Sequence, residues 1–161
     1  MAELKYAKNI ITDTKHIPPE QMEEMRKKME ARMKEKGITP GKSTIESTRL
    51  LWLDDEVAKG AFYMDLLWFW SGSQEQSMEE PHDHDFDEII GFVGTNRDDP
   101  HDLGGEVEIY LDDEKHILTK SCLVFVPRGL KHCPLRFTRI DSPICWFTIG
   151  NSSMYSRTSL D

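Results

Sequence analysis

Short apolar runs, separated by turn-forming residues, dominate the chain after residue 45 and constrain its fold more than any other feature. The runs recur at intervals of about ten residues and are rich in aromatic and β-branched side chains, which favour strands. The segments between them, such as Leu103-Gly-Gly and Pro127-Arg-Gly, have the composition of turns. This pattern predicts an all-β sandwich or barrel. Strands are predicted at residues 49–53, 61–70, 88–93, 106–111, 115–118, 122–126, 132–137 and 144–149.

A helical pattern precedes the strands. Methionines recur at helical spacing between Gln21 and Lys36, which predicts an amphipathic helix that ends near Gly37. This stripe is more typical of packing against the domain or a second subunit than of a binding groove. We therefore expect an N-terminal arm over residues 1–44, with one helix and a linker, and a barrel domain over residues 45–161. The methionines of the stripe are Met22, Met25, Met29 and Met33.

Composition argues against several classes of protein. Asp and Glu number 29 against 20 Lys and Arg, and the resulting net charge of -9 does not suit a protein that neutralises nucleic-acid phosphates. No apolar run approaches the roughly 20 residues of a membrane span, and the first residues lack the apolar segment of a signal peptide. The three cysteines form no C-x-x-C pair, so we expect a reducing, cytoplasmic location without disulfides.

Three of the six histidines have the spacing of metal ligands. His82 and His84 are two residues apart, so an extended chain places both imidazoles on one face, and Glu88 keeps that parity. His132 follows a proline-glycine turn at the start of a predicted strand. Three imidazoles and one carboxylate facing a common interior would bind a divalent transition metal.

The residues around these ligands resemble the two motifs of the cupin superfamily. The first motif is matched by His82, His84, Glu88 and Gly94. The second is matched by Pro127, Gly129 and His132, although Ser121 replaces its first glycine and Arg136 stands where asparagine is common. The resemblance covers residues 45–150. It implies a jelly-roll barrel (a double-stranded β-helix), often dimeric, with one metal ion held in its mouth by His82, His84, Glu88 and His132.

The identity of the metal stays open, because nitrogen and oxygen ligands suit Mn, Fe, Co, Ni, Cu and Zn alike. Cys133 is adjacent to His132, but strict alternation along a strand predicts that its side chain faces away from the metal. We therefore interpret Cys133 as a small buried hydrophobic residue, and Cys122 and Cys145 in the same way.

Strand alternation also predicts which residues line the pocket. Ile90 and Phe92 continue the face of Glu88, and Phe86 continues that of the histidines. Trp68 and Trp70 share one face, which either stacks an aromatic substrate or packs the barrel against the arm. Arg136 has the parity of His132, so it binds either an anionic substrate group or a protein acid.

The ligand set and the resemblance together favour a metal-dependent enzyme that acts on a small organic molecule. We expect this enzyme to be a homodimer. The metal would stabilise an enolate or a similar oxyanion, as in an isomerase, a lyase or a dioxygenase. Glu88 and Arg136 are the predicted catalytic residues, with Glu88 a ligand or a base. The alternatives are a metal-binding or small-ligand-binding protein without turnover, such as a sensor or accessory protein, and a purely structural barrel. The single N-terminal helix offers no recognition helix for a transcriptional role.

The acidic surplus is concentrated around the first motif. Residues 75–114 hold fifteen acids and one base, a net charge of -14, and the rest of the chain carries +5. Such a field favours the capture of a cation and disfavours an anionic substrate unless the metal and Arg136 offset it. A solvated loop face is the alternative interpretation.

Overall fold

The computed structural model describes residues 5–15, 17–35, 41–77 and 79–159. A single 3-10 turn at Ala7–Asn9 and helix α1 (Pro19–Glu35) precede the strands. The strands are β1 (Glu46–Leu53), β2 (Met64–Ser71), β3 (His82–Asp83), β4 (Glu88–Val93), β5 (Asp102–Leu111), β6 (Glu114–Lys120), β7 (Cys122–Val126), β8 (His132–Ile140), β9 (Ile144–Gly150) and β10 (Thr158–Ser159).

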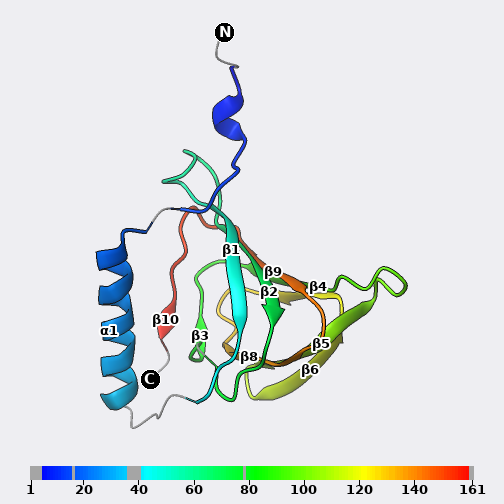
Figure 1. Ribbon diagram of the computed structural model, residues 1–161. Coiled ribbons are helices and arrows are strands. Elements are labelled where there is room, and N and C mark those ends of the chain that lie inside the picture. Colours follow the sequence, from blue (N-terminus) through cyan, green and yellow to red (C-terminus); the bar gives the residue numbers. More distant parts are fainter. Residues whose placement is uncertain (1–4, 16, 36–40, 78, 160–161) are drawn as a thin grey trace.

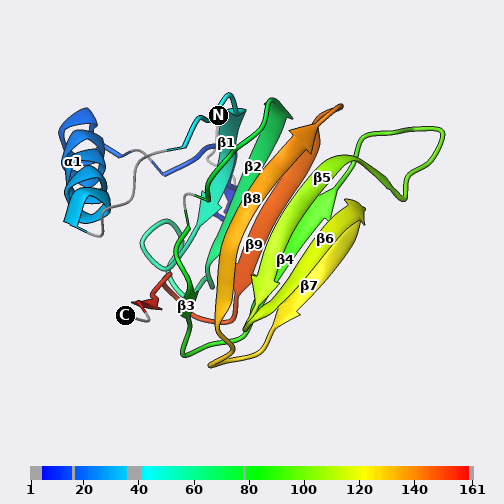
Figure 2. The same ribbon diagram turned by 90° about the horizontal axis from the view of Figure 1, so that it is seen from below.

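Two five-stranded antiparallel sheets form the barrel (Figures 1 and 2). Their strand orders are β1-β2-β9-β4-β7 and β10-β3-β8-β5-β6. Without the outer strands β1 and β10, the order β2-β9-β4-β7 against β3-β8-β5-β6 is that of an eight-stranded jelly roll. The all-β, jelly-roll fold predicted from the sequence is therefore confirmed.

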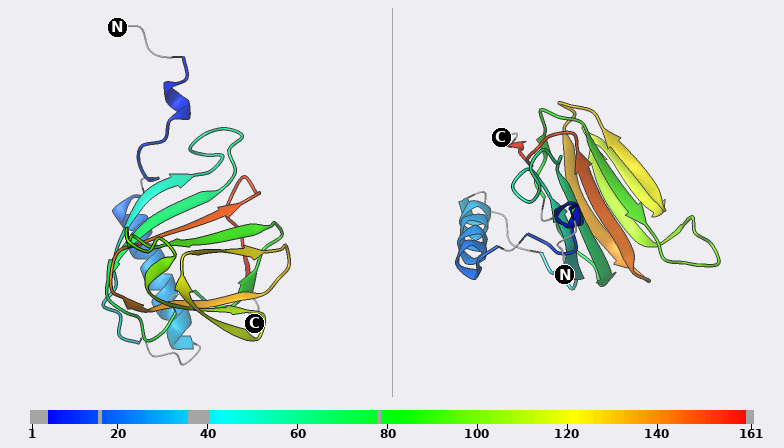
Figure 3. Two further views of the ribbon diagram at one scale, coloured as in Figure 1. Left: turned by 90° about the vertical axis from the view of Figure 1, so that its right-hand side faces the viewer. Right: turned by 90° about the horizontal axis from the view of Figure 1, so that it is seen from above.

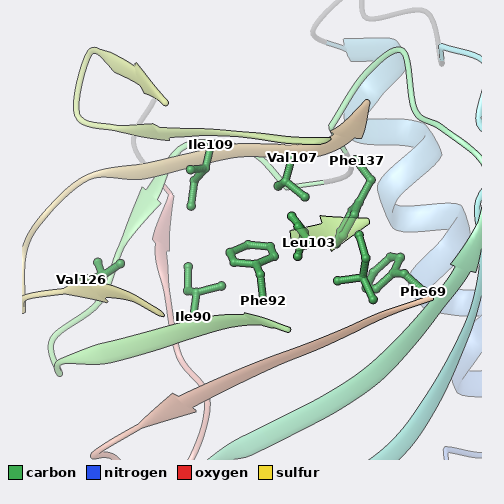
Figure 4. Close-up of a cluster of buried hydrophobic side chains, with 9 residues drawn as sticks. Phe69, Ile90, Phe92, Leu103, Val107, Ile109, Val126 and Phe137 are labelled. Atoms are coloured by element: carbon green, nitrogen blue, oxygen red, sulfur yellow. The ribbon is translucent and has the colours of Figure 1, made fainter. Parts of the chain in front are cut away.

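Apolar side chains from both sheets fill one part of the barrel interior (Figure 4). Strand β4 shows the alternation that places them, because Glu88, Ile90 and Phe92 face inward while Val93 is 42% exposed. The buried cluster consists of Phe69, Ile90, Phe92, Leu103, Val107, Ile109, Val126, Phe137 and Ile144. This cluster fills one part of the interior. The histidines of the two motifs lie in the other part.

Helix α1 lies to one side of the barrel, and the 3-10 turn at Ala7–Asn9 extends away from the sheets (Figures 1 and 3). The helix begins at Pro19, a residue whose fixed φ suits the first helical position. Met22 is 56% exposed; the predicted packing of Met25, Met29 and Met33 and the predicted cap at Gly37 lie outside the described residues. Among the described residues, no helix combines the length and hydropathy that crossing a membrane requires.

Strand β2 turns its odd-numbered residues inward, which corrects the predicted pocket wall of Trp68 and Trp70. Asp65 and Phe69 are buried, whereas Trp70 is 42% exposed and stacks on Trp68 with ring centroids 5.4 Å apart. Both faces of this segment carry large apolar side chains, so the alternation of apolar residues does not show which face points inward. The register with β9 decides it, because β9 buries Ile144 and Thr148 on that side.

Candidate metal centre and its cavity

The three histidines of the two motifs meet inside the barrel. His82 on the short strand β3 pairs directly with His132 at the start of β8, so both side chains leave the sheet on the same face. Their ring centroids are 4.3 Å apart, and the ring of His84 lies 4.9 Å from His82 and 5.0 Å from His132. Each residue is at most 3% exposed. Residues separated by about half of the barrel sequence thus form one imidazole cluster.

Glu88 reaches the same cluster from the opposite sheet. It is the first residue of β4 and is 3% exposed. Its Oε2 lies 3.3 Å from His132 Nε2 and 3.5 Å from His84 Nε2. The carboxylate therefore faces two imidazole nitrogens and is itself almost fully buried.

Hydrogen bonds to main-chain carbonyls fix the tautomer of each imidazole. Nδ1 of His82, His84 and His132 lies 2.7, 2.6 and 3.1 Å from the main-chain carbonyls of Glu80, Ser156 and Leu130. A carbonyl only accepts, so each Nδ1 carries a proton and each neutral ring keeps an electron pair on Nε2. Proteins orient metal-binding histidines in this way.

Two observations test whether these residues fit a metal ion. Nε2 of His84 is buried and has no hydrogen-bond partner. In addition, the carboxylate oxygen and the two unprotonated nitrogens repel one another through their electron pairs unless a cation, either a proton or a metal ion, lies among them. The donor atoms of His84, Glu88 and His132 lie within 4.8 Å of one another, close enough for one ion. The residues fit a divalent transition metal.

The charge states of Glu88 and His82 suit the same role. Burial works to raise the pKa of Glu88, but His132 and His84 outweigh it and lower that pKa, so the carboxylate is ionised at neutral pH. Burial lowers the pKa of His82 to about 4, which leaves this ring neutral. Burial also opposes protonation of His84, but the neighbouring Glu88 outweighs it and raises the pKa of His84.

The turn of the second motif holds the first motif in place. Gly129 has φ 77, a left-handed conformation that favours glycine, and its N–H donates to the carbonyl of His84 at 2.9 Å. The Ser121 hydroxyl, where cupins have glycine, accepts the N–H of Gly94 at 3.0 Å and donates to the carbonyl of Pro100 at 3.0 Å. The departure at Ser121 thus links the two motifs by a hydrogen bond.

A cavity of about 580 Å³ adjoins the cluster, with His82, Glu88 and His132 in its wall. Part of this wall comes from the N-terminal arm, which the sequence did not indicate. Lys15 of the arm is held there by Asp54, at 3.1 Å from its Oδ2. Much of the remaining wall is aromatic or aliphatic, formed by Trp52, Tyr63, Leu67, Phe69, Ile90, Leu135, Phe137, Trp146 and Tyr155. The arm contributes Thr14, Lys15, Ile17 and Gln21.

The cations of the cavity wall are paired. Arg49 binds Asp65 through two hydrogen bonds of 2.9 and 3.0 Å, Lys15 binds Asp54, and Arg157 binds Glu79. Burial raises the pKa of Asp65 even against the opposing charge of Arg49. By contrast, the indole N–H of Trp146 is buried without a partner.

The predicted pocket residues of the first motif divide between cavity and core. Ile90 lines the cavity. Phe92 lies deeper, is 0% exposed and belongs to the apolar cluster. Phe86 stacks on His84, with centroids 4.6 Å apart and planes at 16°, and is not among the residues of the cavity wall. Phe86 and Phe92 therefore support the site without facing its cavity.

Arg136 and Cys133 exchange the faces that alternation predicts. The Arg136 side chain does not line the cavity. It donates hydrogen bonds to Glu108 Oε2 at 2.9 Å and to the carbonyl of Glu75 at 2.6 Å, so Arg136 pairs with a protein acid. Cys133 instead lines the cavity beside His132. The cause is an irregularity in β8, where the register with β5 shifts and Cys133 adopts φ 68. Two consecutive residues then face inward, and the parity of the residues from Leu135 to Phe137 is reversed.

No protein-family model and no curated protein matches the chain. Similar solved structures include an oxalate oxidase, with 18% identity over 71% of this chain and 55% of that one and a TM-score of 0.45. The polyketide cyclase RemF from Streptomyces resistomycificus has 17% identity over 77% of each chain and a TM-score of 0.44. A cupin 2 domain-containing protein from Halorhodospira halophila has 16% identity over 73% of this chain and 70% of that one and a TM-score of 0.45. Likenesses at this level say nothing about the activity of this chain.

Proposed function

We propose that this protein, a jelly roll with both cupin motifs, binds one divalent transition metal and acts on a small organic molecule in the adjoining cavity. The ligands are His82, His84, Glu88 and His132. One observation carries the proposal: three imidazoles, each with Nδ1 committed to a carbonyl, form one buried cluster, and two of them, those of His84 and His132, lie within 3.5 Å of the Glu88 carboxylate. Assembling such a group without a cation costs free energy, because buried charges and polar atoms need partners.

The metal would supply Lewis acidity that stabilises negative charge developing on a substrate oxygen. The chain supplies the surroundings of that reaction. Aromatic walls, including Tyr63 and Trp146, exclude water and contact the apolar part of a substrate.

The charged side chains of the cavity wall indicate what charge a substrate can carry. Within the described residues, each cation that lines the cavity already has a carboxylate partner. A substrate anion therefore finds no free guanidinium or ammonium there, and Arg136 faces away. This supports a molecule whose oxygens bind at the metal and whose remaining part is uncharged. Among the wall carboxylates, Glu88 has only imidazoles beside it, which suits it as a ligand or as a base that takes a substrate proton.

Elemental analysis of the purified protein tests metal binding. We expect one transition metal ion per chain, lost on His82→Ala and kept on His101→Ala, since the His101 side chain is exposed and belongs to no donor group among the described residues. A wild-type protein that stays metal-free in the presence of each candidate metal would contradict the proposal.

Activity is tested on the metal-loaded protein with diketones, catechols and hydroxy acids. Oxygen uptake with product formation would identify a dioxygenase, and product formed under anaerobic conditions an isomerase or a lyase. Metal binding without turnover of any of these substrates would favour the non-catalytic sensor or accessory protein.

We also propose that the protein is a homodimer. Leu123 and Phe125 on β7 are 65% and 61% exposed, and Val93 on β4 is 42% exposed. Copies with a net charge of -9 repel one another, so contact is favoured at this uncharged outer face of β4 and β7. Sedimentation should show a dimer that Phe125→Glu converts to a monomer, while a monomeric wild type would contradict the proposal.

A further inference from the structure

Cys133 brings a thiol to the wall that already holds His82, Glu88 and His132. The donor atoms of His82, His132 and Cys133 lie within 4.8 Å of one another, as do those of His84, Glu88 and His132. Cys133 is 4% exposed and His132 is 1% exposed. The site thus contains two overlapping groups of three donors that share His132.

The two groups differ in chemical softness. His84, Glu88 and His132 offer nitrogen and oxygen, whereas His82, His132 and Cys133 offer two nitrogens and sulfur. Nitrogen and oxygen ligands suit Mn²⁺, and thiolate selects softer ions such as Zn²⁺ and Cd²⁺. Donors around one tetrahedral ion lie roughly 3.3–3.6 Å apart, given metal–nitrogen and metal–sulfur distances of about 2.0 and 2.3 Å. Small side-chain movements therefore bring either group onto one ion.

Two features make the thiol a candidate donor beyond its location. Nδ1 of His82 and Nδ1 of His132 are committed to carbonyls, so their Nε2 atoms are the free donors of this group. The neighbouring Nε2 of His84 is buried and unpartnered, which independently marks this place for a cation. Neither Cys122 nor Cys145 belongs to a donor group among the described residues.

We propose that Cys133 is a metal ligand, and that its Sγ binds thiophilic divalent ions together with His82 and His132. This inference rests on the proposed function and extends it, because the choice of metal then selects the ligand set. On binding, the S–H bond breaks, a metal–sulfur bond forms and the proton passes to solvent, with no change of oxidation state. A harder ion such as Mn²⁺ is held by His82, His84, Glu88 and His132, and the thiol stays protonated.

Cobalt is the probe that tests this proposal, because Co²⁺ reports its ligands by absorption. The full-length protein is freed of metal with a chelator and titrated with Co²⁺. We expect visible bands from bound Co²⁺ and a near-ultraviolet sulfur-to-cobalt band. Cys133→Ser should remove the sulfur band and keep the visible bands, and Cys145→Ser should keep both.

Metal competition gives a second measurement. Cd²⁺ affinity should fall about tenfold or more in Cys133→Ser, in the range that loss of ligand-supporting groups causes, with Mn²⁺ affinity unchanged. An equal loss for both ions would indicate general damage to the site and overturn the proposal. If Cys133→Ser does not fold, X-ray absorption of the cobalt-loaded wild type decides, since a cobalt–sulfur distance supports the proposal and its absence overturns it.

These outcomes separate the two proposals. Visible cobalt bands that depend on His82 but lack any sulfur band would overturn the role of Cys133 and leave the proposed metal site intact. Failure of the wild type to bind cobalt or any other candidate metal would overturn both.

Discussion

Two parts of the barrel interior are built from the same strands and filled in opposite ways. Strand β4 passes through both, with Glu88 in the polar cluster, Ile90 at the cavity wall and Phe92 in the apolar core. The core is closed, since Phe92, Leu103, Val107, Ile109 and Ile144 are all 0% exposed. The other part leaves a cavity lined by buried ionisable groups. The first part stabilises the fold, and the second holds polar groups that only a ligand can satisfy fully.

Removing a large side chain from the apolar core should cause the largest loss of stability. Phe92→Ala removes a fully buried ring, and we expect a loss of about 3–5 kcal/mol in the free energy of unfolding, measured by urea denaturation. Val93→Ala on the same strand is the control and should cost less than about 1 kcal/mol, because Val93 is 42% exposed. Equal losses would show that the two positions do not differ in packing.

Binding of a metal ion at the histidine and glutamate cluster should stabilise the protein against unfolding. At a free Mn²⁺ concentration of 100 times Kd we expect about 2.7 kcal/mol of added stability, measured by urea denaturation with and without metal. Glu88→Gln keeps the side-chain shape but removes the charge, so most of this gain should disappear. Glu114→Gln, whose side chain is 83% exposed, should keep it. A gain of equal size in Glu88→Gln would exclude Glu88 as a ligand.

Breaking the ion pair of the cavity wall should have a moderate effect. Arg49→Met leaves Asp65, whose side chain is 5% exposed, without its cation. We expect a loss of about 1–3 kcal/mol, less than for a fully buried pair because Arg49 is 41% exposed. The double variant Arg49→Met/Asp65→Leu should recover most of the loss in urea denaturation. A double variant as unstable as the single one would show that Arg49 acts through packing instead.

High pH should produce the smallest effect. Burial raises the pKa of Tyr63 well above the ordinary value of 10.0, so the unfolded chain loses this proton first and stability falls as pH rises through that value. For one such group the loss is about 0.8 kcal/mol at pH 10.5. The fall in stability between pH 8 and pH 10.5 should therefore be smaller in Tyr63→Phe than in the wild type. Identical pH profiles would contradict this assignment.

Local patterns were enough to predict the class of fold and the histidine and glutamate donors of the candidate site. Alternating apolar runs located the central strands, and the two histidine motifs identified residues that the structure brings together. The short strands β3 and β10 were missed, because two-residue strands carry no periodicity. Asp65 was the available signal for the inner face of β2, since a lone acid in an apolar strand needs a buried partner.

The sequence by itself determined which segments become strands and which histidines and glutamate form the candidate metal site, since the spacing within each strand and each motif carries that information. The tertiary structure decided which face of each strand points inward and where alternation breaks. Pairing with β9 sends Trp68 and Trp70 outward, and the irregular pairing of β8 with β5 turns Cys133 inward and Arg136 away. The arm completes the cavity wall through contacts with residues distant in the chain. These outcomes depend on partners far away in sequence, and no local pattern contains them.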